Sequence, residues 1–270
     1  MMRVFRCVES QSSAPLYCFQ QADQSWELLE RDGVRFLPTG KKVKPSRFLT
    51  PVQPSAVFAI GVNYAAHAKE FGVAPQTWPT VFMKSTASVI ASGETVRLPR
   101  HLRSDKVDFE AELAVIIGRD FRNATADNAL SNVLGYTCAN DVSARDWQKE
   151  WGGTQWSRGK SFDTFCPLGP CLLTADAVPD VQNLDVEFRL NGEVMQKANT
   201  SDMLFGIVEI LVFLSGSSTV PANSVIITGS PAGVGMGRTP PRWLKPGDTM
   251  ATEISGIGIL ENPVGEEVLG

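Results

Sequence analysis

Three carboxylates in two apolar stretches are the residues of this chain most suited to chemistry. Glu110 and Glu112 stand two positions apart in a stretch that continues in Leu, Val and Ile and ends at Gly118. Such residues favour a strand, and side chains two apart in a strand point to the same face, with Cα atoms roughly 7 Å apart. The stretch 133–141 predicts a second strand that places Asp141 at its end.

Carboxylates this close repel one another, and burial beside apolar residues adds a desolvation cost. A bound cation would remove both penalties. Because no His or Cys accompanies the three carboxylates, they predict a hard oxygen site for Mg²⁺ or Mn²⁺ rather than for structural zinc. The alternative is an edge strand on which Asp108, Glu110 and Glu112 line a solvated face.

A candidate acid–base pair precedes these carboxylates. The segment 63–72 contains good helix formers and closes at a Gly, which predicts a helix. His67 and Glu70 are three residues apart and would be neighbours on one helical face. The carboxylate would orient the imidazole and leave its second nitrogen free to act on water. The alternative is a surface His–Glu contact on a short helix.

Two further segments could hold an anion. The segment 155–160 predicts an irregular loop in which Lys160 either pairs with an anionic ligand or is an ordinary loop lysine. Residues 228–235 come after the buried strand predicted at 225–227, and their glycines expose backbone N–H groups that could hold a carboxylate. They are not a phosphate-binding loop, because the Lys-Ser/Thr of that motif is absent.

The elements that position these residues are predicted from alternation and turn residues. Residues 1 to about 40 predict a small β meander, and the lysines and prolines after them predict a linker. The other expected elements are strands at 57–61 and 79–84, a short helix at 142–149, a hairpin at 184–197 that turns at Asn191-Gly192, and a core helix at 203–214 capped by Ser201-Asp202.

The composition argues against several classes of protein. A net charge of −4 does not suit nucleic acid, which binds basic surfaces. No apolar run reaches the roughly 18 residues of a membrane span. Residues 1–20 lack the apolar block of a secretory signal, and the five cysteines show no paired spacing. We therefore expect a cytoplasmic protein without nucleic-acid or membrane partners.

Several motifs, in this order, resemble the fumarylacetoacetate hydrolase family, in particular its smaller bacterial and acylpyruvase-like members. The matching stretches are 61–64 with His67 and Glu70, 108–113, 140–146, 160–164, 167–170, 191–193 and 228–235. The resemblance implies an α+β, mainly β fold. Residues 51–270 would form a catalytic domain built as a mixed β-sheet roll, and residues 1–50 a small β-rich domain and linker.

The resemblance also implies the roles of individual residues. Mg²⁺ or Mn²⁺ would be held by Glu110, Glu112 and Asp141, catalysis would involve His67, Glu70 and Lys160, and Gln148 and Thr228 would contact the keto and carboxylate oxygens of a small oxo acid. A homodimer is the usual assembly of the family.

The predicted activity is hydrolysis of a carbon–carbon bond in a small 2,4-dioxo acid of the acylpyruvate or fumarylpyruvate type. The metal would chelate the 1-carboxylate and 2-oxo oxygens and stabilise an enolate. His67 would activate water for attack on the distal carbonyl, and Lys160 would neutralise the oxyanion.

Other activities use the same enolate chemistry, namely decarboxylation or tautomerisation of oxaloacetate-like acids and isomerisation of hydroxymuconate-type dienes. His67 with Glu70 favours hydrolysis, because activating water needs a base. A non-catalytic binder of metal–oxo acid complexes would have lost the dyad or a ligand, and all are present. A Mg²⁺ nuclease or phosphatase is disfavoured by the acidic composition.

Overall fold

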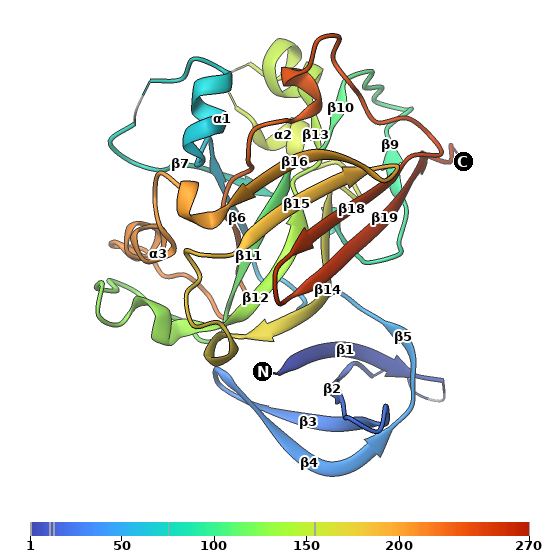
Figure 1. Ribbon diagram of the computed structural model, residues 1–270, viewed down its shortest axis with the longest axis vertical. Helices are drawn as coiled ribbons and strands as arrows, with labels where there is room; N and C mark the ends of the chain where they lie inside the picture. Colours follow the sequence, from blue (N-terminus) through green and yellow to red (C-terminus); the bar gives the residue numbers. More distant parts are fainter. Residues whose placement is uncertain (1, 11, 13, 75, 154, 270) are drawn as a thin grey trace.

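The computed structural model describes residues 2–10, 12, 14–74, 76–153 and 155–269. Figure 1 shows a strand-rich body above a smaller lobe, with few and short helices. Strands pair in both directions: β6 (Val57–Gly61) runs parallel to β17 (Val225–Ile227) and antiparallel to β7 (Thr80–Lys84). The expected α+β, mainly β class with mixed sheets is confirmed.

The largest sheet has twelve strands. Besides β6, β7 and β17 these are β1 (Arg3–Glu9), β2 (Leu16–Gln20), β3 (Trp26–Asp32), β4 (Arg35–Val43), β5 (Pro45–Phe48), β8 (Val89–Ala91), β11 (Ala111–Ile117), β12 (Val133–Asn140) and β14 (Cys166–Thr174). Their order is β4-β3-β2-β1-β14-β12-β11-β17-β6-β7, with β5 beside β1 and β8 beside β14. The apolar strands β11 and β12 are buried along their whole length and form its centre.

Strands β1 to β5 form the lower lobe in Figure 1, and β1 joins it to the body by pairing with β14. The strands expected at 3–9 and 16–20 are confirmed. Part of the expected linker, Pro45–Phe48, is strand β5 instead, because its backbone pairs with β1. The division of the chain into domains at residue 50 stays a prediction.

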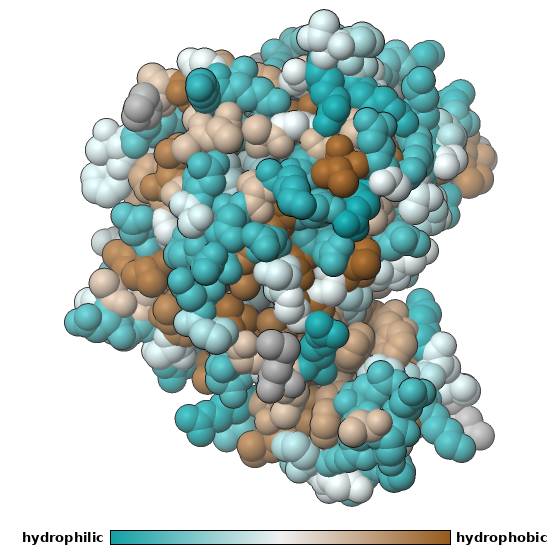
Figure 2. Space-filling view, in the orientation of Figure 1, coloured by the Kyte–Doolittle hydropathy of each residue, from teal (hydrophilic) through white to brown (hydrophobic). Residues whose placement is uncertain are grey.

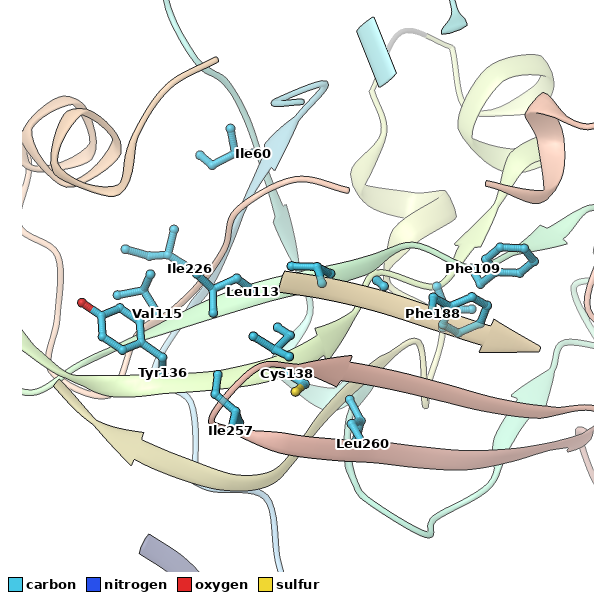
Figure 3. Packing of buried hydrophobic residues seen from close by; sticks show 14 of the residues in the cluster. Ile60, Phe109, Leu113, Val115, Tyr136, Cys138, Phe188, Ile226, Ile257 and Leu260 are labelled. Atoms are coloured by element: carbon cyan, nitrogen blue, oxygen red, sulfur yellow. The ribbon is translucent and has the colours of Figure 1, made fainter. Parts of the chain in front are cut away.

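A second sheet has five strands in the order β16-β15-β18-β19-β9, located at β9 (Val96–Leu98), β15 (Asp185–Leu190), β16 (Glu193–Asn199), β18 (Thr249–Ile254) and β19 (Gly258–Glu266). It packs over β11, β12 and β14. Figure 3 shows the apolar layer between the sheets, where the rings of Phe109 and Phe188 stack with centroids 4.5 Å apart. The expected hairpin is confirmed, because Asn191 and Gly192 have the positive φ angles, 54° and 84°, of a type I′ turn.

Buried apolar and solvent-facing charged side chains alternate along β15, so the two faces of this sheet differ. Val186 and Phe188 are fully buried against the body. On the outer face, Arg189 pairs with Glu253, and Lys197 pairs with Glu187. Figure 2 shows that the surface over these strands is largely hydrophilic, as expected for the solvated side of an antiparallel sheet.

The α-helices in the described residues are α1 (Ala65–Glu70), α2 (Ser157–Lys160) and α3 (Ile207–Ser215), and 3₁₀ turns lie at η1 (Thr86–Ser88), η2 (Ala129–Asn132), η4 (Ala175–Ala177), η5 (Thr200–Asp202) and η6 (Gly235–Gly237). None of the helices in this part of the chain is long and apolar enough to cross a membrane.

Asn63 shortens the helix expected at 203–214. It precedes α1, and its carbonyl accepts from the Leu204 N–H at 2.8 Å while its side-chain oxygen accepts from the Phe205 N–H at 2.9 Å. The backbone before Ile207 is therefore bound to Asn63 rather than in a helical turn, and α3 begins four residues later than expected from the sequence.

Two other local expectations were only partly correct. The segment 142–149, expected as one short helix, contains strand β13 (Ser143–Ala144), which pairs with β10 (Val107–Asp108). The chain then forms a π-helical turn, η3 (Trp147–Trp151). The segment expected as an irregular loop ends in α2, so that Lys160 is the last residue of a short helix.

Candidate active site

The carboxylates lie on a central strand. β11 has β12 on one side and β17 on the other. Glu112 is 2% exposed and Asp141, directly after β12, is fully buried. The alternative of a solvated edge strand is therefore wrong.

The stretch expected as one strand is interrupted at Glu110. Strand β10 ends at Asp108 and β11 begins at Ala111. In the gap, the Glu110 N–H donates to the side-chain oxygen of Asn140 at 3.1 Å, and the Ala111 N–H donates to that of Gln196 at 3.0 Å. Side chains thus replace a neighbouring strand as hydrogen-bond partners, which breaks the ladder.

The interruption does not separate the three carboxylates. Candidate ligand oxygens of Glu110, Glu112 and Asp141 lie within 4.8 Å of one another. Burial raises the pKa of Glu112 well above its ordinary value, and the carboxylates of Asp141 and Glu110 raise it further. Three buried, mutually repelling oxygen donors fit a hard divalent cation.

Basic side chains enclose the acidic cluster. The Lys160 ammonium lies 2.5 Å from Glu110 Oε2 and 2.6 Å from Asp141 Oδ2. Burial opposes its charge, but the carboxylates of Asp141 and Glu110 outweigh burial and raise the pKa of Lys160. Lys160 is therefore a buried ammonium at the centre of the site, not an ordinary loop lysine.

Two more buried cations were not predicted as site residues. Lys84, the last residue of β7, lies 2.5 Å from Asp141 Oδ1. Arg145 lies 2.7 Å from Glu110 and 2.8 Å from Asp108. Lys84 could have been recognised as the lone charge that ends an apolar strand, and Arg145 as the basic residue four positions after Asp141.

The charges of this cluster nearly balance. With all four carboxylates ionised (Asp108, Glu110, Glu112 and Asp141), the three cations bound to them (Lys84, Arg145 and Lys160) leave one excess negative charge. A divalent cation would make the cluster net positive by one charge. The loaded site would therefore attract a small anionic acid.

His67 and Glu70 form the expected pair on α1, with His67 Nδ1 3.0 Å from Glu70 Oε2. Because a carboxylate only accepts, Nδ1 carries the proton and Nε2 is the nitrogen available for proton transfer. His67 is only 6% exposed, so the alternative of a surface contact is wrong. The other oxygen of Glu70 accepts from the Gly233 N–H at 3.1 Å.

The glycine-rich segment after β17 holds the protein's own carboxylates. The Gly229 N–H donates to Glu112 at 2.6 Å, and the Gly235 N–H donates to Asp108 at 2.7 Å. Gly229 has a φ of +100°, and a Cβ there would lie 2.6 Å from Asn63. The N–H groups expected to hold a ligand carboxylate therefore orient the acidic cluster instead.

A cavity of about 110 Å³ lies against these groups. Its charged and polar lining consists of His67, Glu110, Glu112, Asp141, Arg145, Gln148, Lys149, Lys160 and Ser230, and its apolar lining includes Ile60, Phe71, Val73, Phe82, Trp156 and Met236. The structure thus brings the expected catalytic and metal-ligating side chains together, with Glu70 behind His67.

The two residues expected to contact substrate differ in position. Gln148 lines the cavity, and its side-chain oxygen accepts from Arg145 at 2.9 Å. Thr228 does not line the cavity, because its hydroxyl turns away and donates to the Leu113 carbonyl at 2.9 Å. Ser230 lines the cavity two residues further on. A substrate contact from Thr228 stays a prediction.

Comparison with known proteins places this site in a family. The family model described as fumarylacetoacetate (FAA) hydrolase C-terminal matches residues 56–265. The mitochondrial oxaloacetate tautomerase FAHD2A of Homo sapiens is 44% identical over 218 residues, which are 80% of this chain and 69% of that protein. The mitochondrial oxaloacetate tautomerase fahd2 of Xenopus laevis is 42% identical over 217 residues, 80% of this chain and 67% of that protein.

Solved structures agree over the whole chain. The 2-hydroxyhepta-2,4-diene-1,7-dioate isomerase from Mycobacterium marinum superposes with a TM-score of 0.84 at 33% identity and covers 100% of both chains. The fumarylacetoacetate hydrolase from Exiguobacterium antarcticum gives a TM-score of 0.83 at 36% identity, covering 99% of this chain and 100% of that one. The chain therefore belongs to the fumarylacetoacetate hydrolase family of enzymes.

Proposed function

We propose that this protein interconverts the keto and enol forms of a small 2-oxo acid of the oxaloacetate type, with Mg²⁺ or Mn²⁺ as cofactor. The observation that carries the proposal is that His67 and the three carboxylates line one small cavity. Its volume of about 110 Å³ suits an acid of a few carbon atoms rather than the drug-sized ligands of pockets of about 300–1,000 Å³. The relatives that carry the name oxaloacetate tautomerase support this choice of reaction.

His67 would act as the base. Its Nε2 would take a proton from C3 of the keto acid while Glu70 holds Nδ1–H in place. The C3–H bond breaks, a C2–C3 double bond forms, and the proton returns to the 2-oxo oxygen, so no atom is gained or lost. When bound at Glu110, Glu112 and Asp141, the metal supplies a Lewis acid that polarises the 2-oxo group.

Two other side chains would stabilise the reacting anion. The Lys160 ammonium is buried beside the carboxylates and would offset negative charge that develops on the 2-oxo oxygen. Gln148 uses its side-chain oxygen to bind Arg145, so its amide N–H₂ is left to donate to the substrate carboxylate. Because these groups are already held by the protein, little reorganisation accompanies the reaction.

A second candidate is the hydrolysis of a carbon–carbon bond in a 2,4-dioxo acid. The His67–Glu70 pair favours it, since the same Nε2 could activate a water molecule. We rank tautomerisation first because both sequence relatives named above are oxaloacetate tautomerases, whereas the structural neighbours named are one isomerase and one hydrolase. The cytoplasmic location remains a prediction from the sequence, and the homodimer remains a prediction from the family resemblance.

One assay separates these activities. The enol of oxaloacetate is followed by its ultraviolet absorbance, with Mg²⁺ or with chelator, beside acetylpyruvate and fumarylpyruvate, while pyruvate is measured in every reaction. Metal-dependent loss of the enol without pyruvate supports the tautomerase. Pyruvate from a dioxo acid would establish the hydrolase, and pyruvate from oxaloacetate a decarboxylase. Enol loss at the spontaneous rate would overturn the first proposal.

A further inference from the structure

One cation of the cavity has no carboxylate to bind. Among the described lysines and arginines that line it, Arg145 and Lys160 each pair with acidic side chains within 2.8 Å, and Lys149 has no acidic partner within salt-bridge distance. The neighbouring carboxylate, Glu150, pairs with Lys106 instead. Lys149 therefore brings to the cavity a positive charge that has no direct carboxylate partner.

The Lys149 ammonium lines the cavity, while the residue as a whole is exposed to solvent. It lies 5.4 Å from the ring centroid of Phe71, which lines the same cavity. Partial burial and then the positive charge of Arg145 lower the pKa of Lys149. A cation in such surroundings gains from a bound anion.

Packing between residues of the same turn fixes the backbone around Lys149. Lys149 lies in the π-helical turn η3 directly after Gln148, and π-helical turns are frequent at functional sites. The Trp147 ring packs edge-on against Trp151 at 5.2 Å. The turn closes onto Gly152, where a Cβ would lie 2.0 Å from the Trp147 carbonyl oxygen. Lys149 thus comes from a defined turn and not from a free loop.

We propose that Lys149 is a specificity-determining residue that binds the distal carboxylate of a dicarboxylic 2-oxo acid. The inference rests on the proposed function, in which the 1-carboxylate and 2-oxo group lie at the acidic cluster. A second carboxylate would then meet the ammonium that the protein leaves unpaired. Phe71, Val73 and Trp156 line the same cavity and would shield this pair from water on the cavity side, while Lys149 stays exposed on its other side.

The test compares oxaloacetate with its 4-methyl ester, which keeps the carbon skeleton and blocks only the distal carboxylate. Lys149→Met retains an unbranched apolar stem, and Lys149→Arg retains the charge. Lys69→Met is the matched control, because it removes one positive charge from an exposed position of α1 outside the cavity lining. We expect Lys149→Met to lower kcat/KM for oxaloacetate about tenfold, with little change for the ester, the effect of one charge-assisted hydrogen bond.

Lys149→Arg should keep most of the preference for the free acid, and Lys69→Met all of it. Equal losses on acid and ester, or no loss on either, would overturn the role of Lys149. If the wild-type protein does not turn over oxaloacetate, calorimetric binding of the acid and the ester in Mg²⁺ replaces the kinetics. If the wild-type protein then binds the acid more tightly than the ester and Lys149→Met loses this preference, the role of Lys149 is supported although the proposed reaction is rejected. Absence of any preference would reject it.

Discussion

The two halves of the candidate site are built differently. In the sheet half, Asp141 directly succeeds a central strand, is fully buried, and meets the ammonium groups of Lys84 and Lys160 at 2.5 and 2.6 Å. In the helix half, His67 and Glu70 lie on α1, which has only six residues. This helix is capped not by its own Tyr64 but by Asp202, whose carboxylate accepts from the Ala66 N–H at 3.1 Å. A helix this short is not stable by itself, so contacts such as Glu70 with the Gly233 N–H must hold it.

This difference suggests a division of labour. Burying ion pairs costs desolvation energy, so the paired charges of the sheet half are poorly explained as a device for stability. They are better explained as a fixed frame whose geometry does not change when a metal and an acid bind. The helix half carries the group that moves a proton, and it can adjust more readily because it is a helix of only six residues held by tertiary contacts.

The largest expected effect lies in the sheet half. Asp141→Asn removes the charge shared by Lys84 and Lys160 and leaves two buried ammonium groups undercompensated. We expect the free energy of unfolding to fall by about 3–5 kcal/mol, measured by urea denaturation, together with loss of activity. The control is Asp105→Asn, which removes an exposed ion pair with Arg103. Equal stability of the two variants would show that the frame is not held by its charges.

The helix half should respond in activity rather than in stability. We expect His67→Ala to lower the rate of enolisation by about 10²–10⁴-fold, because it removes the proposed base. Decarboxylation of oxaloacetate, which needs only the metal, should persist, as should Mg²⁺ binding measured by calorimetry. His101→Ala, at the chain's other histidine, is the control. Equal loss of enolisation and decarboxylation would contradict this separation of roles.

Local patterns sufficed for the functional residues that lie close together in sequence. The spacing of Glu110 and Glu112 and of His67 and Glu70 predicted groups that the structure brings together, with Glu110, Glu112 and His67 lining one cavity and Glu70 bound to His67 behind it. Strand ends were also predictable where an apolar run stops, as for Asp141 after β12. These features depend on neighbours two to four residues away, which periodicity reports directly.

Contacts between distant residues could not be predicted in this way. The amide of Gln196 replaces a strand at Ala111, and Asn63 ties down the backbone before α3. The sequence could mark Lys84 as an unusual charge at the end of an apolar strand, but its contact with Asp141 arises only once the fold brings β7 and the end of β12 together. No local pattern marks a side chain that binds a backbone far along the chain.

Metal binding tests whether the acidic cluster is a site or only a structural charge network. Mg²⁺ at a hundred times its Kd should raise the free energy of unfolding by about 2.7 kcal/mol, because the metal would bind only the folded protein. Glu112→Gln, which removes one ligand of the triad, should abolish most of this gain in urea denaturation. NaCl at equal ionic strength is the control. Equal stabilisation by both salts would indicate screening rather than a site.

The smallest effect is expected for Glu70, which acts through His67. Glu70→Gln retains the size of the side chain but weakens the hydrogen bond to Nδ1 by removing the negative charge. The imidazolium formed during catalysis then loses its counter-ion. If this loss costs about 1.5 kcal/mol of transition-state stabilisation, kcat should fall roughly tenfold. KM should hardly change, since Glu70 does not line the cavity. A loss as large as that of His67→Ala would mean that Glu70 itself takes part in proton transfer, and the helix half would then contain two catalytic groups instead of one base and its support.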